Sequence, residues 1–419
     1  MKAGFGRGEI IFPEELFPLE GFCGVHDNPH IRVMALDGGR DKMAFAALEL
    51  VNCPAREVGI CRQMISEATG TPREQVWVHM THAITTPHEP GPMGPPDKRP
   101  PVTEEDLKKR ELFYRAIETA MEQALKELNE SYTDVRFGWS SGVCEVNTNR
   151  DVETPFGWWI GAGSDRPSNH RMSVLCMENM DGTPAGYFVS YGLKPCAIDN
   201  SGMREGKRLV SSEVCGMACT RAENELGAPV LFCMSAAGDQ IPVKTSFREV
   251  VDENGKAQLA DEGVEAGFAY AKELGDTMGD AIIRIAGEAS CDQTEAATGW
   301  KKLSFEWERR RGTGRTPQKE LVNEPEGKKT EFTAELFRLG EAVFLAERPE
   351  VNAQTELELI EQSPFEHMIL MSMVNGEMKY LPDRWSFEHA TWEAQSSMLM
   401  PGAAEKFVEE AVACMKALR

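Results

Sequence analysis

Apolar residues fall into short runs separated by amphipathic stretches over the first 240 residues. The runs 31–36, 43–51 and 76–80 are rich in apolar residues, and the first two flank the turn-forming stretch 37–41. Apolar runs of this length that are bounded by turn residues predict β-strands.

The stretches between these runs have a helical period. Residues 56–68 place apolar side chains on one face, and Gly70 follows as a stop signal. Residues 103–106 form a capping signature before a long amphipathic stretch. The apolar stripe of that stretch comprises Phe113, Ile117, Ala120, Met121, Ala124 and Leu128. Alternating strands and helices predict a mixed α/β fold in which helices cover the sheets.

The pattern becomes richer in strands from about residue 296. Leu303, Phe305 and Trp307 alternate with polar residues, which predicts a strand with one solvent-facing side. Residues 332–345 then predict a hairpin.

Two further segments complete this portion of the chain. Residues 309–329 are polar and contain glycine and proline, which predicts a flexible surface loop. Residues 405–418 predict a closing amphipathic helix. With 419 residues, 41% of them apolar, the sequence predicts a single catalytic domain over 1–419 with a β-richer C-terminal portion.

The sequence carries a formal net charge of −22. A surface this acidic repels phosphate backbones and anionic lipid, so neither nucleic acid nor a membrane is expected as a partner. No window of about eighteen residues is continuously apolar, and the N-terminal segment lacks the apolar core of a signal peptide. We therefore expect a cytoplasmic protein with reduced cysteines, and leave open whether it forms a homo-oligomer.

Several common catalytic signatures are absent or out of context. Residues 138–142 match the Gly-x-Ser-x-Gly pattern of a nucleophile elbow, but an extended stretch follows where that motif requires a helix. The sequence has no phosphate-binding loop, no dinucleotide fingerprint after a strand and no His-Glu-x-x-His motif. These enzyme classes are therefore not indicated.

Histidines gather where the predicted strand 76–80 enters a loop. His79, His82 and His88 are three of only eight histidines in the sequence. Open α/β sheets place ligands at the carboxyl ends of their strands, and histidine is the commonest metal ligand. The alternative is a polar cluster that caps loop carbonyls, and spacing alone does not decide between the two.

Two acidic residues have a similar setting. An apolar run at 231–234 breaks at small residues and leads to Asp239, and another run at 339–345 leads to Glu350. Each acid alone is typical of a turn or a helix cap, whereas together they are better explained by a shared cleft.

Six motifs in order resemble the N-terminal catalytic domain of the neutral/alkaline (non-lysosomal) ceramidase family. Residues 76–87 are similar, without gaps, to the family's stretch ending Thr-His-Thr-His-Ser-Gly-Pro. The other five are residues 146–150, 212–216, 236–242, 348–350 and 375–382. The resemblance runs almost end to end and implies a divergent, cytoplasmic, bacterial-type member with that family's fold.

The resemblance implies a zinc amidase site. His82, Glu350 and Tyr380 match three metal ligands, and the position of the second histidine ligand is taken by Tyr191. Arg150 matches the arginine that steadies the reacting carbonyl.

Two departures bear on the chemistry. Ile84 stands at the family's second loop histidine, and Ile241 stands at the ceramidase serine. A mechanism through that serine is therefore excluded.

The remaining donors form an oxygen-rich set. We expect zinc, with manganese or iron as alternatives, and His79 or His88 as a replacement ligand. The cation would activate water, and the catalytic candidates are Arg150 for the oxyanion and Asp239 or His88 for the proton.

The expected partner is a small molecule other than ceramide, since an acidic cytoplasmic protein has no route to membrane lipid. Trp158 and Trp159 lie in a glycine-rich loop and could form aromatic walls, or could pack on the core, and Asn149 is a further binding candidate. We also do not expect the C-terminal immunoglobulin-like domain of full-length ceramidases.

The sequence thus predicts a metal-dependent hydrolase that acts on an amide, ester, lactone or activated carbon–carbon bond. The alternative is a catalytically inactive scaffold that binds a small molecule or a protein.

Overall fold

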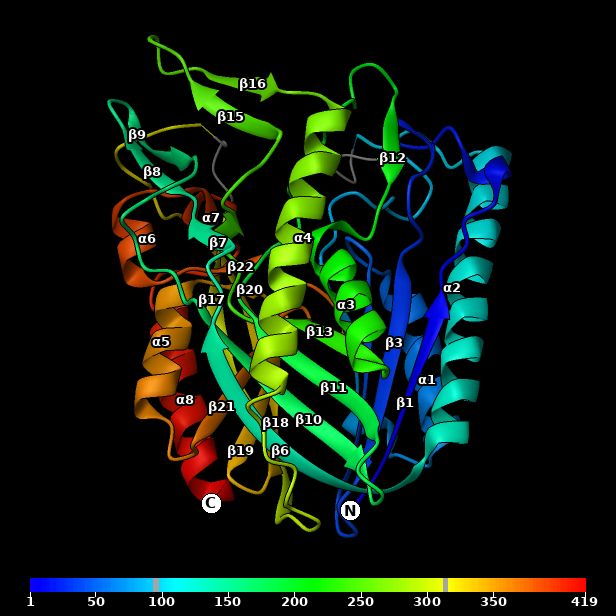
Figure 1. The fold of residues 1–419 in the computed structure, drawn as a ribbon. Coiled ribbons are helices and arrows are strands. Elements are labelled where there is room, and N and C mark those ends of the chain that lie inside the picture. Colours follow the sequence, from blue (N-terminus) through cyan, green and yellow to red (C-terminus); the bar gives the residue numbers. More distant parts are fainter. Residues whose placement is uncertain (93–97, 312–315) are drawn as a thin grey trace.

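Two β-sheets pack face to face in the computed structural model, which describes residues 1–92, 98–311 and 316–419 (Figure 1). The larger sheet runs in the order β13 (Val230–Met234), β11 (Pro184–Tyr191), β10 (Arg171–Asn179), β6 (Thr133–Val143), β1 (Lys2–Glu9), β3 (His30–Asp37), β4 (Lys42–Leu48) and β5 (Val76–Met80). The smaller sheet runs in the order β17 (Thr298–Arg310), β18 (Pro325–Leu339), β19 (Ala342–Glu347) and β21 (His367–Met371).

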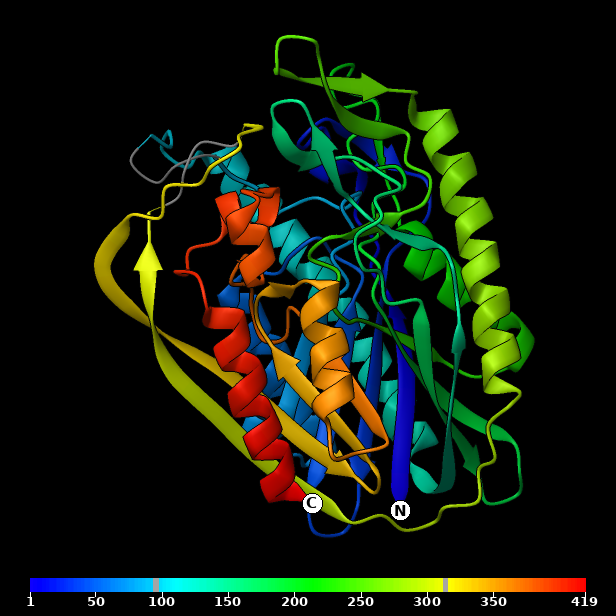
Figure 2. The same ribbon diagram turned by 90° about the vertical axis from the view of Figure 1, so that its left-hand side faces the viewer.

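Helices cover both outer faces, as Figure 2 shows for the side of the smaller sheet. The larger sheet carries α1 (Ala55–Thr69), α2 (Glu104–Ser131), α3 (Glu213–Leu226) and α4 (Val264–Ala286). The smaller sheet carries α5 (Ala353–Gln362) and α8 (Ala403–Leu418). The result is four layers in the order helix, sheet, sheet, helix. This is the mixed α/β fold with helix-covered sheets that the sequence predicts.

The alternation of side chains along each strand produces these layers. On β19, Phe344 points between the two sheets, whereas Val343 and Leu345 point toward the helices α5 and α8. On β11, Phe188 joins the layer between the sheets and Val189 joins the layer beneath α3 and α4. Because successive strand residues face opposite sides, each strand contributes to two cores.

Glycines on β1 let α2 lie directly against the sheet. A Cβ atom on Gly6 would stand 2.0 Å from the carbonyl oxygen of Ala124, and one on Gly8 would stand 1.8 Å from that of Ala120. Only residues without a side chain fit this approach.

The remaining elements are short and lie mostly toward the same end of the molecule (Figure 1). The described residues form five two-stranded pairs: β2 (Phe22–Val25) with β12 (Arg208–Val210), β7 (Asn147–Asn149) with β14 (Gln240–Pro242), β8 (Asp151–Thr154) with β9 (Gly157–Ile160), β15 (Phe247–Val251) with β16 (Ala257–Asp261), and β20 (Glu350–Val351) with β22 (Tyr380–Leu381). The short helices are α6 (Arg384–Glu388) and α7 (Trp392–Ser396).

Most of the predicted elements are confirmed. The runs at 31–36, 43–51 and 76–80 are β3, β4 and β5, and the two N-terminal helical stretches are α1 and α2. Gly70 caps α1 in the left-handed conformation, and Thr103 and Asp106 form a reciprocal capping box on α2. The hairpin at 332–345 is β18–β19, and the closing helix is α8.

The predicted loop at 309–329 is wrong at both ends, because β17 continues to Arg310. β18 begins at Pro325 and pairs with β17 as far as Arg310, while residues 312–315 lie outside the described part of the chain. Polar residues on both faces of this extension face solvent, so its sequence lacks the apolar alternation of a core strand.

All eleven cysteines are free thiols, and eight of them are buried. In the described ranges, none of the helices combines the length and the apolar character that a bilayer crossing requires.

We expect Phe344→Ala to lower the free energy of unfolding by about 3–5 kcal/mol, because it empties a position between the sheets. Phe344 contacts Trp139 and Phe188 with ring centroids 5.7 and 5.4 Å apart. Phe344→Leu should cost less. Urea denaturation measures both, with Val322→Ala as a control because Val322 is 68% exposed. A loss no larger than that of the control would contradict this packing.

Candidate active site

A cavity of about 230 Å³ lies beyond the ends of the long strands, and three of the candidate ligand and catalytic residues line it. His82, Arg150 and Tyr380 line it. Its apolar wall consists of Ile84, Ile160, Ile241, Phe247 and Trp392, and its other polar residues include Lys194, Asp199, Asn200, Thr245, Arg248 and Glu249. Glu350 lines an adjoining hollow of about 160 Å³, which shares Tyr380 and Trp392 with the cavity.

Backbone connections bring these side chains together. His82 follows the end of β5 by two residues, and Lys194 follows the end of β11 by three. Glu350 and Tyr380 stand opposite each other in the parallel pair β20–β22. Arg150 lies between β7 and β8, where its N–H donates to the carbonyl of Asp239 at 2.9 Å. Five separate parts of the chain thus meet at one place.

His82 is held in a defined orientation and tautomer. Its backbone has a φ of 61°, in the left-handed region that non-glycine residues rarely adopt. Its Nδ1 lies 2.7 Å from the carbonyl oxygen of Val51, which can only accept, so Nδ1 carries the proton. Burial lowers the pKa of His82, and the neutral ring therefore presents a lone pair on Nε2. That atom lies 3.7 Å from Oε1 of Glu350.

Glu350 and Lys194 form a buried ion pair beside this imidazole. Their side chains are 8% and 4% exposed. Burial opposes the charge of each side chain, but their mutual attraction is stronger. Lys194 lowers the pKa of Glu350, and Glu350 raises the pKa of Lys194. The Lys194 ammonium also donates to the Tyr380 hydroxyl at 3.1 Å. A carboxylate, an ammonium and a phenol therefore form one connected group.

Arg150 brings a second buried cation to the same wall. Its Nε donates to Oε1 of Glu393 at 2.8 Å, and its guanidinium lies 5.5 Å from the centre of the Tyr380 ring. Burial opposes the charge, but Glu393, Tyr380 and Glu350 raise the pKa of Arg150 well above its ordinary value. Arg150 thus remains charged at the cavity.

The other two loop histidines have different surroundings. His79 receives a hydrogen bond on Nε2 from the N–H of Met234 at 3.0 Å, and its Nδ1 lies 2.8 Å from the carbonyl of Ser372. Both ring nitrogens are used by the backbone, so His79 cannot replace a metal ligand as the sequence allows. His88 pairs with Glu20 at 2.9 Å and is absent from the cavity lining, so the structure does not place it as a catalytic group.

The structure also moves Tyr191 away from the predicted ligand set. Its hydroxyl donates to the carbonyl of Cys144 or to Oδ1 of Asn147, 2.5 and 2.6 Å away, and it accepts from the N–H of Asn147. Burial raises the pKa of Tyr191, which disfavours a phenolate. The predicted position of this residue as a ligand is corrected because its side chain belongs to the core beneath β11.

Asp239 and Asn149 lie next to the backbone of Arg150 and hold it in position. Asp239 accepts from the N–H of Ala353 at the start of α5 and from Nδ2 of Asn149, both at 2.9 Å. Burial raises the pKa of Asp239 to about 6. Neither residue lines the cavity, which corrects their predicted catalytic and binding positions. Both fix the backbone that carries Arg150.

The tryptophan pair of the glycine-rich loop is not at the cavity wall. Trp158 packs edge-on against Trp385 at 4.8 Å. Trp159 is 1% exposed, donates to Glu249 at 2.8 Å and packs edge-on against Trp392 at 5.4 Å. Trp392 is the tryptophan that lines the cavity, and Trp159 packs behind it.

Sequence reasoning missed Lys194, Asp199 and Trp392. Lys194 lies in the segment 193–198, where it is the only charged residue among apolar neighbours. A lone lysine in such a setting is a usable signal, because a lysine is almost never fully buried without a partner. Asp199 has a φ of 49°, and burial, followed by Glu213, raises its pKa to about 7.

The donor set does not fit a divalent metal in this arrangement. Across the described ranges, no three histidine, cysteine, aspartate or glutamate side chains converge as a metal centre. His82, Glu350 and Tyr380 are close, but the ammonium of Lys194 contacts two of them. A metal ion bound here would share Glu350 and Tyr380 with the ammonium of Lys194, and the two positive charges would repel each other.

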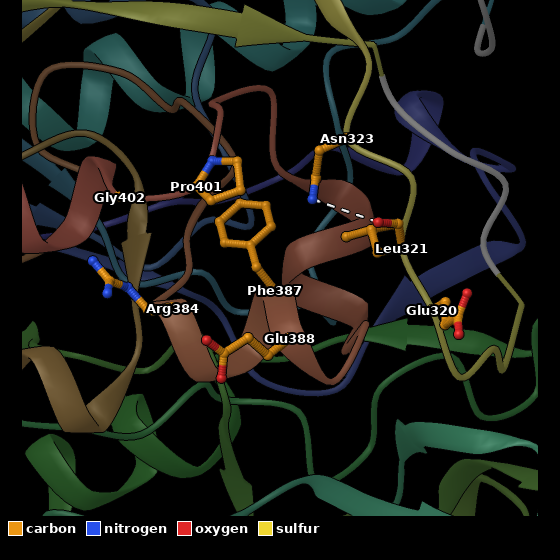
Figure 3. A pocket seen from close by; sticks show the side chains of 8 residues that line it. All are labelled: Glu320, Leu321, Asn323, Arg384, Phe387, Glu388, Pro401 and Gly402. Carbon is orange, nitrogen blue, oxygen red and sulfur yellow. Dashed lines mark hydrogen bonds between the residues drawn. The ribbon is translucent and has the colours of Figure 1, made fainter.

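A larger and more open hollow of about 620 Å³ lies beside α6 (Figure 3). The ring of Phe387 lies against Pro401, and Nδ2 of Asn323 donates to the carbonyl of Leu321 at 3.5 Å. Its charged side chains, Glu320, Arg384 and Glu388, are exposed to solvent. Exposed charges are screened by water, so this hollow offers weaker chemistry than the cavity at His82.

We predict an acid-sensitive fold, because burial lowers the pKa of His79 to about 4. Between that value and the ordinary value near 6.5, the unfolded chain binds the proton more readily, so stability falls as the pH falls. From pH 7 to 5, His79 should contribute a loss of about 2 kcal/mol in the free energy of unfolding.

Urea denaturation at both pH values checks this. The pH-dependent loss should be smaller by this amount in His79→Gln than in the wild type. His26→Gln, at a side chain 45% exposed, should keep the full loss. Equal losses in all three proteins would rule out the assigned role of His79.

The fold occurs in known proteins. No family model and no curated protein matches the sequence. Among solved structures, the chain is similar to neutral ceramidase from Pseudomonas aeruginosa, with a TM-score of 0.70 and 15% identity over 99% of this chain and 74% of that one. It is also similar to a ceramidase complexed with C2, with a TM-score of 0.69 and 14% identity over 99% and 75%. The resemblance indicated by the motifs is confirmed at the level of the fold: the chain has the neutral ceramidase fold.

Proposed function

We propose that this chain is a hydrolase that attacks a small carbonyl substrate with water in the cavity at His82. The observation that carries the proposal is a neutral imidazole whose free Nε2 faces a buried carboxylate, Glu350, across 3.7 Å. Ile241 lines the cavity at the position of the ceramidase serine, so the nucleophile is water. Solved structures of the same fold are of ceramidases, which supports hydrolysis by analogy of fold alone.

The proposed reaction uses the groups on the cavity wall. A water molecule within about 2.8 Å of both Nε2 of His82 and Oε1 of Glu350 would be held by two acceptors. His82 takes a proton as the water oxygen bonds to the carbonyl carbon. The resulting oxyanion is stabilised by the guanidinium of Arg150 and by the hydroxyl of Tyr380. His82 then returns the proton to the leaving group as the bond to the carbonyl carbon breaks.

Backbone strain supports a functional role for this place. His82 and Asp199 both have positive φ angles, which cost non-glycine residues roughly 1–2 kcal/mol each. Strained residues of this kind cluster at active sites and ligand clamps. Buried charges that converge on a cavity are a second mark of such sites.

The cavity favours a small substrate with an apolar part. Ile84, Ile160 and Phe247 face a volume of about 230 Å³, which suits a short acyl chain or a single ring. We therefore propose a substrate other than ceramide. Whether the bond is an amide, an ester, a lactone or an activated carbon–carbon bond stays open. The cytoplasmic location and the choice between monomer and homo-oligomer stay predictions from the sequence.

Two further candidates each have one observation in their favour. The metal-dependent form, with zinc, manganese or iron, is favoured by the short distance between His82 and Glu350. The inactive scaffold is favoured by the use of the Tyr191 hydroxyl within the core. Lys194 argues against the first, and the strain at His82 argues against the second.

We expect His82→Ala and Glu350→Gln to lower kcat/KM by about 10²–10⁴-fold, because each removes a group that activates water. The assay uses p-nitrophenyl esters and p-nitroanilides with acyl chains of two to about eight carbons, since longer chains would not fit the volume of the cavity. His26→Ala serves as the matched histidine control.

Rates unchanged in both cavity variants would overturn the assignment. An absence of turnover over the whole panel, with saturable binding of the same acyl groups, would favour the inactive scaffold.

A further inference from the structure

Lys194 lies at the point where the predicted metal ligands meet. Its ammonium is ion-paired with Glu350, donates to the Tyr380 hydroxyl at 3.1 Å and lies 5.0 Å from the centre of the Tyr380 ring. Two of the three nearby donors that would hold a metal ion therefore already hold a cation that belongs to the chain.

The backbone fixes this lysine in place. The carboxylate of Glu213 accepts hydrogen bonds from the N–H groups of Ala197 and Ile198, 3.1 and 2.7 Å away. The carbonyl of Pro195 accepts from the N–H of Ile84 at 3.2 Å. The loop after β11 is thus tied to α3 and to the loop that carries His82. With a side chain 4% exposed, Lys194 is part of the interior.

Two buried ion pairs at this point each carry no net charge. Lys194 and Arg150 supply two positive charges, and their ion-pair partners Glu350 and Glu393 supply two negative charges. All four side chains are at most 8% exposed. A divalent cation added to this set would leave a buried excess of positive charge, which the interior stabilises poorly.

We propose that the ammonium of Lys194 takes the place of a divalent cation in this site, so that lysine and metal exclude each other. The ammonium keeps Glu350 ionised and directs a positive charge and N–H donors at the cavity wall. It has no open coordination position, so activation of water falls to His82. This last consequence rests on the proposed hydrolase function, whereas the exclusion of the metal does not.

The test measures zinc binding to the purified full chain and does not depend on catalysis. Wild type, Lys194→Ala, Lys194→Arg and Lys194→Ala/His82→Ala are titrated with ZnCl₂ in a calorimeter, and bound zinc is counted after dialysis. Lys194→Ala should bind zinc at least about 100-fold more tightly than wild type, because a buried like charge has been removed. The double variant should lose this gain, and Lys194→Arg should resemble the wild type.

Thermal unfolding provides the second measurement. Lys194→Ala should melt below the wild type, because it leaves Glu350 buried without its cation, and zinc should raise its Tm. Zinc should not raise the Tm of the wild type through His82. Any zinc-dependent rise in the Tm of the wild type should therefore be equally large in His82→Ala.

Three results would overturn the proposal. One is a wild type that binds one zinc per chain through His82. Another is a Lys194→Ala variant that gains neither zinc affinity nor a zinc-dependent Tm. The third is a gain that survives in the double variant. If Lys194→Ala does not fold without metal, refolding with and without ZnCl₂, together with the wild-type titration, gives the same decision. A failed ester or anilide assay would bear on the hydrolase alone.

Discussion

The buried carboxylate of Glu350 constrains the positions of the side chains around it. An ionised group inside a protein requires a partner of opposite charge, because the interior replaces water poorly. Here the partner is Lys194, and the arrangement extends from it to the phenol of Tyr380 and the guanidinium of Arg150. The register of β20 against β22 and the loop after β11 therefore have to be fixed together.

The four-layer fold supplies the rigidity for this arrangement. His82 and Lys194 follow strands whose side chains are locked on both faces, between the sheets and beneath the helices. Asp239 joins the start of α5 to Asn149, next to the backbone of Arg150. Loops that are anchored in this way hold strained residues such as His82, and a strained residue persists only where its surroundings determine its conformation.

The sequence predicts the elements whose side chains separate into an apolar and a polar face. The capping box at Thr103 and the glycine stop at Gly70 are local signals, and both lie where the structure has them. The start of β18 at Pro325 could not be predicted, because this part of the hairpin is polar on both faces. The alternation of apolar and polar residues reveals a strand only when one of its faces is buried, and this part of β18 has no buried face.

Residues of the candidate site could be predicted only where the resemblance to the ceramidase family assigned a role to the same type of side chain. Glu350 and Tyr380 meet, and His82 and Arg150 join them, although no local pattern links these four positions.

Tyr191 shows the limit of that reasoning. Its hydroxyl is used by Asn147 and Cys144 in the core, and Lys194, three positions further along the chain, forms the ion pair with Glu350. A preserved scaffold therefore does not preserve a ligand set. The buried carboxylate of Glu350 needs a positive charge nearby, and Lys194 meets that electrostatic requirement with chemistry different from that of a metal ion.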